Sequence, residues 1–265
     1  MLQFLKMNGA GNDFIIFDAR VSKIKLSDLY IQKLCNRKNI GCDQLVVIKN
    51  SSRAECFIEI YNQDGSESAV CGNATRCVAA IIMEEKNSAA IVIETAAGLL
   101  NCWRHNDHYI SSENNISVEM RAPIFEKNFL FNDLEFFCVD MGNPHAVIFV
   151  DYMPSDADFF ELAPAIENHP FFLHKTNVEF AKIISDKTVE VRVWERGTGE
   201  TLACGSGACA VVAAAIKNNL IKNDKIITRF KGGDLTIEWS GDKLPIIMTG
   251  GYKKIFIGTV DENFL

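Results

Sequence analysis

The same sequence pattern occurs twice in this chain, and each copy ends in a cysteine that opens a glycine-containing turn into an apolar, helix-like run. The two cysteines, Cys71 and Cys204, lie 133 positions apart. At this offset the following pairs are identical or similar without a gap: Ile60/Val193, Tyr61/Trp194, Glu67/Glu200, Ser68/Thr201, Gly72/Gly205 and Val78/Val211. A duplicated unit that spans about half of the chain explains this shared register.

The repeat extends towards the N-terminus, where Gly9/Gly142, Ile15/Ile148 and Asp18/Asp151 hold the same offset. Both copies there contain a short apolar run, 14–17 and 147–150, that predicts a buried strand. Helices are predicted near 27–38, 73–85, 159–167 and 206–218. Strands are predicted near 3–7, 14–18, 45–49, 56–61, 90–94, 99–103, 108–111, 116–120, 136–140, 146–150, 179–185, 189–194, 226–230, 234–239 and 246–250.

Two domains are expected, because 265 residues lie near the upper limit for a single hydrophobic core. The polar stretch 111–115 lacks periodicity and is the predicted crossing between them. The first domain is assigned to 1–115 and the second to 116–249. The last stretch, 252–260, follows Gly250-Gly251 and reads as a strand that returns to the first domain, which therefore includes 250–265.

Composition excludes several classes of protein. A net charge of -7 without a basic stripe argues against nucleic-acid binding. Nine cysteines, together with a start that lacks the pattern of a signal peptide, indicate a reduced, cytoplasmic setting. The longest apolar stretches fall short of the roughly 20 residues that span a bilayer, so no membrane segment is expected.

Cys71 and Cys204 each precede small residues, Gly72-Asn73 and Gly205-Ser206, and then an alanine-rich run. Small residues leave the first helical turn open, so that its free backbone N–H groups can face an anionic ligand beside the sulfur. A helix N-terminus stabilises a nearby anion by about 0.3–1 kcal/mol, rising to about 2 kcal/mol when partly buried. This effect predicts thiol pKa values of about 7–8 instead of about 8.5.

Two such thiols facing one small cleft resist double ionisation, because the first charge opposes the second. One thiolate and one thiol are therefore the expected resting pair. Such a pair can remove a proton from one face of a carbon and deliver another to the opposite face. The sequence thus predicts racemisation or epimerisation by two bases.

The remaining cysteines are interpreted as small buried hydrophobic residues, as a cysteine in an apolar run usually is: Cys35, Cys42, Cys56, Cys77, Cys102, Cys138 and Cys209. A zinc site is not expected, because no paired C-x-x-C or Cys/His cluster has ligand spacing. The same absence weakens a thioredoxin-like redox role. Gly9-Ala10-Gly11 and Gly205-Ser206-Gly207 lack the residues of a dinucleotide or phosphate loop.

Several polar segments stand where strands are predicted to end. They are 8–14, 41–44, 61–62, 141–145, 176–179 and 194–196. An asparagine in such a place is usually only a turn residue. Together, however, these amides and the guanidinium of Arg196 suit a zwitterionic substrate with more than one carboxylate.

With these motifs in view, the chain resembles the diaminopimelate epimerase family along its whole length. The matching segments are Gly-Ala-Gly-Asn-Asp-Phe at 9–14, Asp43-Gln44, 61–67, 71–73, Met-Gly-Asn-Pro-His at 141–145, 177–180, 195–197 and 200–207. The resemblance implies a fold of α/β (α+β) class with two pseudo-symmetric domains. Each domain is expected to be a mostly antiparallel or mixed sheet wrapped around a central helix, with the active site in the cleft between them.

The resemblance also implies an enzyme that converts LL-diaminopimelate to the meso form without any cofactor or metal, in lysine and peptidoglycan precursor synthesis. Cys71 and Cys204 match the catalytic cysteines, and His145 and Glu195 match residues that tune their protonation. Gly72, Asn73, Gly205 and Ser206 match the groups that hold the reacting carboxylate. The remaining substrate contacts, with Glu195 again among them, match Asn12, Gln44, Asn62, Asn143, Asn177 and Arg196.

Ala74 stands where many family members have glycine. We also expect a homodimer.

Related racemases of proline or histidine also use a pair of thiols, and related isomerases lack the thiols. In this chain, Glu195-Arg196 and Asn177 favour a substrate with a distant carboxylate. A thiol-based redox or binding protein would leave the repeat and the asparagines unexplained.

Overall fold

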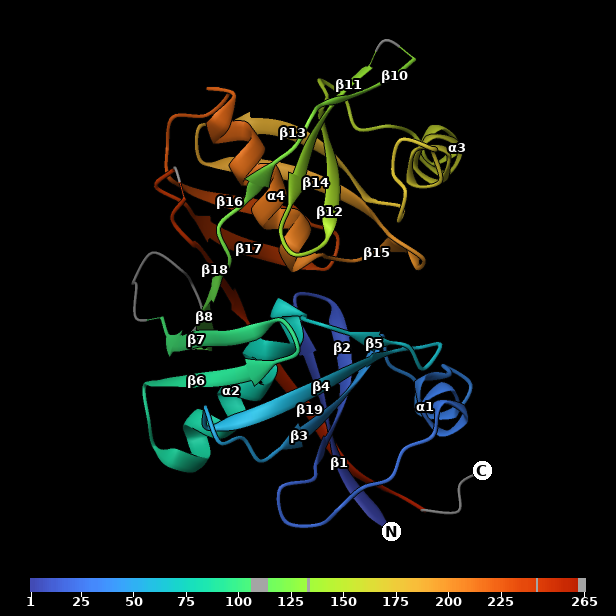
Figure 1. The fold of residues 1–265 in the computed structure, drawn as a ribbon, viewed down its shortest axis with the longest axis vertical. Coiled ribbons are helices and arrows are strands. Elements are labelled where there is room, and N and C mark those ends of the chain that lie inside the picture. The colour runs from blue at the N-terminus through green and yellow to red at the C-terminus, as the bar shows by residue number, and fades with distance from the viewer. Residues whose placement is uncertain (106–113, 133, 242, 262–265) are drawn as a thin grey trace. The chain divides into compact units, whose positions relative to one another are not determined.

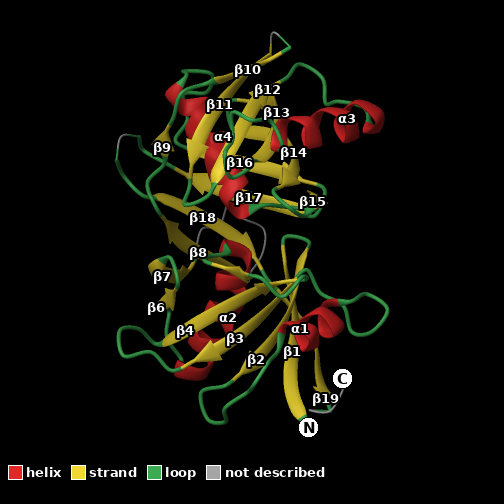
Figure 2. Ribbon diagram, turned by 45° about the vertical axis from the view of Figure 1, so that its right-hand side comes forward, coloured by secondary structure: helices red, strands yellow, loops and turns green. Residues whose placement is uncertain are grey.

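The computed structural model describes residues 1–105, 114–132, 134–241 and 243–261 (Figure 1). The chain divides into two compact units, one formed by Met1–Val118 with Gly250–Leu265 and the other by Glu119–Thr249. Within the described residues, each unit consists mainly of strands and contains two helices (Figure 2). The chain is therefore a mixed α/β protein dominated by β-structure, as the sequence predicts.

The elements of the first unit are β1 (Leu2–Gly9), β2 (Asn12–Asp18), α1 (Asp28–Cys35), β3 (Gln44–Lys49), β4 (Cys56–Asn62), β5 (Glu67–Ser68), α2 (Gly72–Lys86), β6 (Ala90–Thr95), β7 (Gly98–Arg104) and β19 (Lys253–Val260). Two strands run across the division between the units, β8 (Asn115–Met120) and β18 (Ile246–Gly251).

The elements of the second unit are β9 (Ile124–Phe125), β10 (Phe129–Phe131), β11 (Leu134–Asp140), β12 (Pro144–Phe149), α3 (Asp156–Glu167), β13 (Asn177–Ser185), β14 (Thr188–Glu195), β15 (Gly199–Thr201), α4 (Gly205–Lys217), β16 (Lys225–Phe230) and β17 (Gly233–Glu238).

The strands of the two units pair in the same order. β1 pairs with β2, and β11 with β12, in antiparallel fashion. β2 then pairs with β3, and β12 with β13, in parallel fashion. The antiparallel pairs β3–β4 and β13–β14 and the parallel pairs β4–β6 and β14–β16 complete the match. The repeat in the sequence is therefore a repeat of topology.

A central helix lies against the strands of each unit. α2 packs against β1, β2, β6 and β7, and α4 packs against β11, β12, β13, β16 and β17. Both helices are buried along most of their length. Alanine is the commonest residue in each of them, and small side chains let a sheet approach a helix from several directions. α2 also buries three polar residues, Asn73, Thr75 and Arg76.

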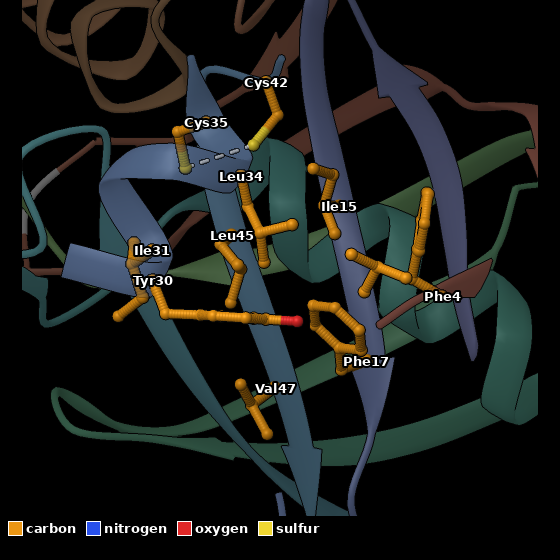
Figure 3. Packing of buried hydrophobic residues seen from close by; sticks show 11 residues of the cluster. Phe4, Ile15, Phe17, Tyr30, Ile31, Leu34, Cys35, Cys42, Leu45 and Val47 are labelled. Carbon is orange, nitrogen blue, oxygen red and sulfur yellow. Dashed lines mark hydrogen bonds between the residues drawn. The ribbon is translucent and has the colours of Figure 1, made fainter. Parts of the chain in front are cut away.

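A shorter outer helix covers the opposite face of the sheet in each unit. α1 contacts β3 and α3 contacts β13. In the first unit the side chains between α1 and the sheet form one apolar cluster, in which Tyr30 and Leu34 meet Phe17 and Leu45 (Figure 3). Strands covered on both faces read as continuous apolar runs, which accounts for the unbroken 14–17 segment.

The last described strand, β19, lies beside the first, β1. Leu2 pairs with Val260 and Asn8 with Lys253 in an antiparallel register. A Cβ at Gly258 would lie 2.4 Å from Cζ of Phe4, so this position has no room for a larger residue. The strand predicted at 252–260 is thus present and belongs to the sheet of the first unit.

All four predicted helices are present, with ends that differ by a few residues. The strand predicted near 108–111 lies outside the described residues. The sequence does not predict β5, β9, β10 and β15, because two or three residues are too few to show a period. None of the helices in the described ranges is long and apolar enough to cross a membrane.

Candidate active site

Cys71 and Cys204 occupy the N-cap positions of the two central helices. Their backbones are extended, with φ of -143° and -127°, and neither side chain makes a capping hydrogen bond. Their carbonyl oxygens accept the first helical bonds, from the amides of Thr75 and Ala208, each at 2.9 Å. The outer helices have serine at this position instead. Cysteine gives up the usual N-cap bond and places a thiol at the positive end of the helix dipole.

The first half-site, as we call it, consists of Cys71 and three neutral amides, those of Asn12, Gln44 and Asn62. Sγ of Cys71 lies 3.8 Å from Oδ1 of Asn12, which begins β2. Gln44, at the start of β3, donates through Nε2 to Oδ1 of Asn62, at the end of β4, over 2.9 Å. Asn73 is buried in the first turn of α2.

The second half-site consists of Cys204, His145, Asn177 and Glu195. Sγ of Cys204 lies 3.5 Å from Oγ of Ser206, in the first turn of α4. Glu195, at the end of β14, accepts a hydrogen bond from the hydroxyl of Thr201 at 2.5 Å and another from the thiol of Cys204. Removal from water raises the pKa of Glu195, although the residue as a whole is only half-buried.

The offset of 133 that relates the two cysteines also relates the rest of the two half-sites, because Asn12 corresponds to His145, Gln44 to Asn177 and Asn62 to Glu195. The strand register agrees: Gln44 pairs with Asn62 across β3–β4, and the matching β13–β14 ladder pairs Val178 with Trp194, one step from Asn177 and Glu195. The half-sites are therefore equivalent in position but different in chemistry. The first has amides where the second has an imidazole and a carboxyl group.

Burial overrides the helix dipole at Cys204. The sequence predicts a thiol pKa of about 7–8 from the helix N-terminus alone. The residue is only 5% exposed, however, and burial together with the charges of Glu195 and Glu179 raises the pKa of Cys204 well above its usual value. The prediction was wrong for this thiol, because sequence patterns do not reveal how deeply a side chain is buried. Cys71 is half-buried.

His145 lies at the centre of a chain of hydrogen bonds in the second unit. Its Nδ1 is 2.7 Å from Oε1 of Glu179, and its Nε2 is 3.1 Å from Oδ1 of Asn143. Asn143 in turn donates from Nδ2 to Oγ of Ser206 over 3.3 Å. The structure thus brings together four of the predicted site residues, namely Asn143, His145, Cys204 and Ser206.

Asn177 and Arg196 contact each other through the backbone. Oδ1 of Asn177 accepts from the amide of Arg196 at 3.0 Å, and its Nδ2 donates to the carbonyl of Pro144 at 2.8 Å. The side chain of Asn177 therefore joins β12, β13 and the turn after β14. The guanidinium of Arg196 is exposed and donates to the carbonyl of His174 at 3.1 Å.

Two carboxylates that the sequence does not predict as site residues, Asp43 and Glu179, contact these half-sites. Oδ2 of Asp43 accepts from Nδ2 of Asn12 at 3.0 Å, which turns the amide oxygen of Asn12 towards Cys71. Arg37 holds the other oxygen of Asp43 at 2.6 Å. Both carboxylates stand in polar segments that the sequence singled out, but only the strand pairing shows which side chains they reach.

Across the described ranges, no group of three or more histidine, cysteine, aspartate or glutamate side chains is arranged to hold a metal ion. All nine cysteines are free, and the seven that the sequence interprets as buried hydrophobic residues are indeed buried.

The same two-unit fold is found in solved structures. A PhzF-family phenazine biosynthesis protein from Bacillus anthracis superposes with a TM-score of 0.75 at 17% identity, covering 98% of each chain. A probable proline racemase from Agrobacterium radiobacter gives a TM-score of 0.76 at 14% identity, covering 98% of this chain and 93% of the other. These similarities place the chain in the fold class of the PhzF and proline racemase type, with two pseudo-symmetric domains.

The sequence profile named "Diaminopimelate epimerase" matches residues 4–121 and 137–255. A diaminopimelate epimerase from Leptospira biflexa is 40% identical over 285 residues, covering 98% of this chain and 99% of that protein. One from Rhodospirillum centenum is 37% identical over 281 residues, covering 99% and 94%. The chain belongs to the diaminopimelate epimerase family.

Proposed function

We propose that the chain is an isomerase that converts LL-diaminopimelate to meso-diaminopimelate by a two-base mechanism, in the synthesis of lysine and peptidoglycan precursors. The observation that carries the proposal is the placement of one thiol at the start of each central helix, in two units of equal topology. A two-base inversion needs one group that removes a proton and another that delivers one to the opposite face. Membership of the family supports the substrate.

In this mechanism one cysteine thiolate removes the α-proton, and the electron pair left on the carbon spreads into the adjacent carboxylate. The other cysteine then donates its proton to the opposite face. Free N–H groups at Gly72-Asn73 and Gly205-Ser206 bind the reacting carboxylate, where they stabilise the negative charge that develops. Burial raises the pKa of Cys204, which suits this thiol to act as the acid, and in that direction Cys71 is the base.

The other predicted residues divide into two groups. His145 and Glu195 tune the protonation of the thiols, since both lie in the half-site of Cys204. The substrate is held by the side chains of Asn12, Gln44, Asn62, Asn143, Asn177, Glu195 and Arg196. Arg196 suits the carboxylate at the non-reacting end, because an exposed guanidinium offers two parallel donors to a planar anion.

The reaction needs no cofactor in this scheme, because the two thiols carry out both proton transfers. We further propose that the protein is cytoplasmic and forms a homodimer. The odd number of cysteines, nine, fits a reducing compartment.

The direct test is incubation with LL-diaminopimelate in deuterium oxide, followed by chiral chromatography and mass spectrometry. We expect the meso isomer to appear with deuterium at the inverted carbon. Cys71→Ser and Cys204→Ser proteins are the controls and should form the product about 10²–10⁴-fold more slowly. Faster racemisation of proline or histidine than of diaminopimelate would contradict the proposed substrate but not the proposed mechanism with two thiols.

A further inference from the structure

Glu179 is a buried carboxylate with no role in the reaction described so far. It lies on β13, and neither its side chain nor that of His145 is exposed to solvent. Oε1 of Glu179 lies 2.7 Å from Nδ1 of His145. No described residue hydrogen-bonds Oε2. Burial of a half-paired carboxylate costs stability, so its presence needs a reason.

The fold itself does not supply that reason. At the repeat offset of 133, Glu179 corresponds to Val46 on β3, which is fully buried in the first unit. β3 and β13 occupy the same place in the pairing order of their units, each between a parallel and an antiparallel neighbour. An aliphatic side chain therefore satisfies this position of the fold.

A second difference between the units accompanies the first. Gly207, in the first turn of α4, corresponds to Ala74 in α2. A Cβ at Gly207 would lie 2.7 Å from Oε1 of Glu179, which is far inside van der Waals contact. Glycine at 207 thus makes room for the carboxylate, whereas the first unit combines valine with alanine. The pair Glu179 and Gly207 is a feature of the half-site that contains a histidine.

We propose that Glu179 is a positioning residue of the reaction, which fixes the ring of His145 with its proton on Nδ1 and directs Nε2 into the hydrogen-bond chain that ends at Cys204. The proposal rests on the epimerase function proposed above. In the first half-site the residue that corresponds to His145 is Asn12. Its side-chain amide, unlike an imidazole, has no alternative position for a proton. A carboxylate is therefore needed in the second unit alone.

The chain of contacts from Glu179 to the thiol is continuous. Nε2 of His145 is 3.1 Å from Oδ1 of Asn143, Nδ2 of Asn143 is 3.3 Å from Oγ of Ser206, and that hydroxyl is 3.5 Å from Sγ of Cys204. In this arrangement Nδ1 of His145 donates to the carboxylate of Glu179, and Nε2 faces the side-chain amide of Asn143.

The other titratable groups of this half-site are Glu195, at the end of β14, and Cys204, before α4. Both are coupled to the pair of Glu179 and His145, since the charge of Glu179 acts on each of them. Removal of the carboxylate therefore changes the charge around the thiol as well as the orientation of the imidazole.

The experiment compares Glu179→Val, Glu179→Gln and a control, Glu200→Gln, in the full-length protein. Valine is the residue of the first unit, so Glu179→Val should fold with a melting temperature within about 5 °C of the wild type. Its kcat for diaminopimelate should fall by about 10²-fold or more, whereas KM should change by less than about threefold. Glu200 is a matched control because it pairs with Arg192 at 2.7 Å in the same unit without touching His145.

A second readout does not depend on activity. The ¹⁵N shifts of the His145 ring, assigned with a His145→Asn protein, report which nitrogen carries a proton. In the wild type and in Glu200→Gln, Nδ1 should be protonated. In Glu179→Gln, the side-chain amide can donate to Nδ1, so the proton should leave that nitrogen.

Three results would overturn the proposal. They are a Glu179→Val protein with kcat within threefold of the wild type, one that no longer folds and so reveals a structural role, and a Glu179→Gln protein with unchanged ring shifts. Failure of the wild type to epimerise diaminopimelate would count against the proposed function instead, because the ring shifts need no substrate.

Discussion

The effect of Gly207→Ala on the free energy of unfolding tests how α4 packs against Glu179. Alanine is normally better than glycine inside a helix by about 0.5–1 kcal/mol. Here the added Cβ would lie 2.7 Å from Oε1 of Glu179 and 3.3 Å from Cβ of Cys204. The carboxylate must move away, and its bond of 2.7 Å to His145 must lengthen or break. Loss of a buried, charge-assisted hydrogen bond costs about 1–3 kcal/mol.

Whether Gly207→Ala stabilises or destabilises the protein should therefore depend on residue 179. In the wild type, Gly207→Ala should lower the free energy of unfolding by about 0.5–2 kcal/mol. This value is the cost of the lost hydrogen bond minus the energy gained from the higher helix propensity of alanine. In a Glu179→Val background the same change should be neutral or stabilising by up to about 1 kcal/mol. The coupling between the two positions is then about 1–3 kcal/mol, within the range for residues in contact.

Urea unfolding of the four proteins measures this coupling. The chain has three tryptophans, of which Trp194 and Trp239 lie in the second unit and Trp103 in the first. A Trp103→Phe background therefore makes fluorescence report on the second unit alone. Equal effects of Gly207→Ala in both backgrounds, within about 0.5 kcal/mol, would refute the reasoning.

Three further outcomes are expected. Cys71→Ser and Cys204→Ser should each lower kcat by about 10²–10⁴-fold, because serine is too weak an acid to replace either proton carrier; steady-state assays with near-normal rates would reject the two-base scheme. Arg196→Lys should lower kcat/KM for diaminopimelate by about tenfold or more, since an ammonium cannot form two parallel bonds; an unchanged value would remove Arg196 from substrate recognition. Burial raises the pKa of Cys77 and of Cys102 from 9.0 to about 12, so the unfolded chain loses these protons first as pH rises. Between the pH values that equal these two pKa values, the free energy of unfolding should then fall by about 1.4 kcal/mol per pH unit for each thiol. Urea unfolding of Cys102→Ala over the same pH range should show a smaller fall.

The repeat made much of the fold predictable. Two copies of one pattern imply two units of one topology, and the long periodic segments that became α2 and α4 were found in place. Short strands such as β15, with three residues, carry no period, because their pairing depends on β14. Tertiary contact forms them, so a local reading of the sequence cannot detect them.

Site residues could be predicted only where the residue type and its neighbours indicate the chemistry. A cysteine before glycine, twice in register, indicates paired thiols. Glu179 gives no such signal, because a carboxylate within a strand normally faces solvent. Its link to His145 follows from the parallel pairing of β12 with β13, which joins segments more than 30 positions apart.

The return of β19 to β1 has a consequence for synthesis on the ribosome. The second unit is one continuous segment, Glu119–Thr249, so translation adds all of its residues before it reaches β19. The first unit, although its synthesis begins earlier, lacks the strand that pairs with β1 until Lys253–Val260 have been added. Until then β1 presents an open edge, to which another nascent chain can add a strand. The first unit, although its synthesis begins first, is thus the later of the two to acquire all of its strands.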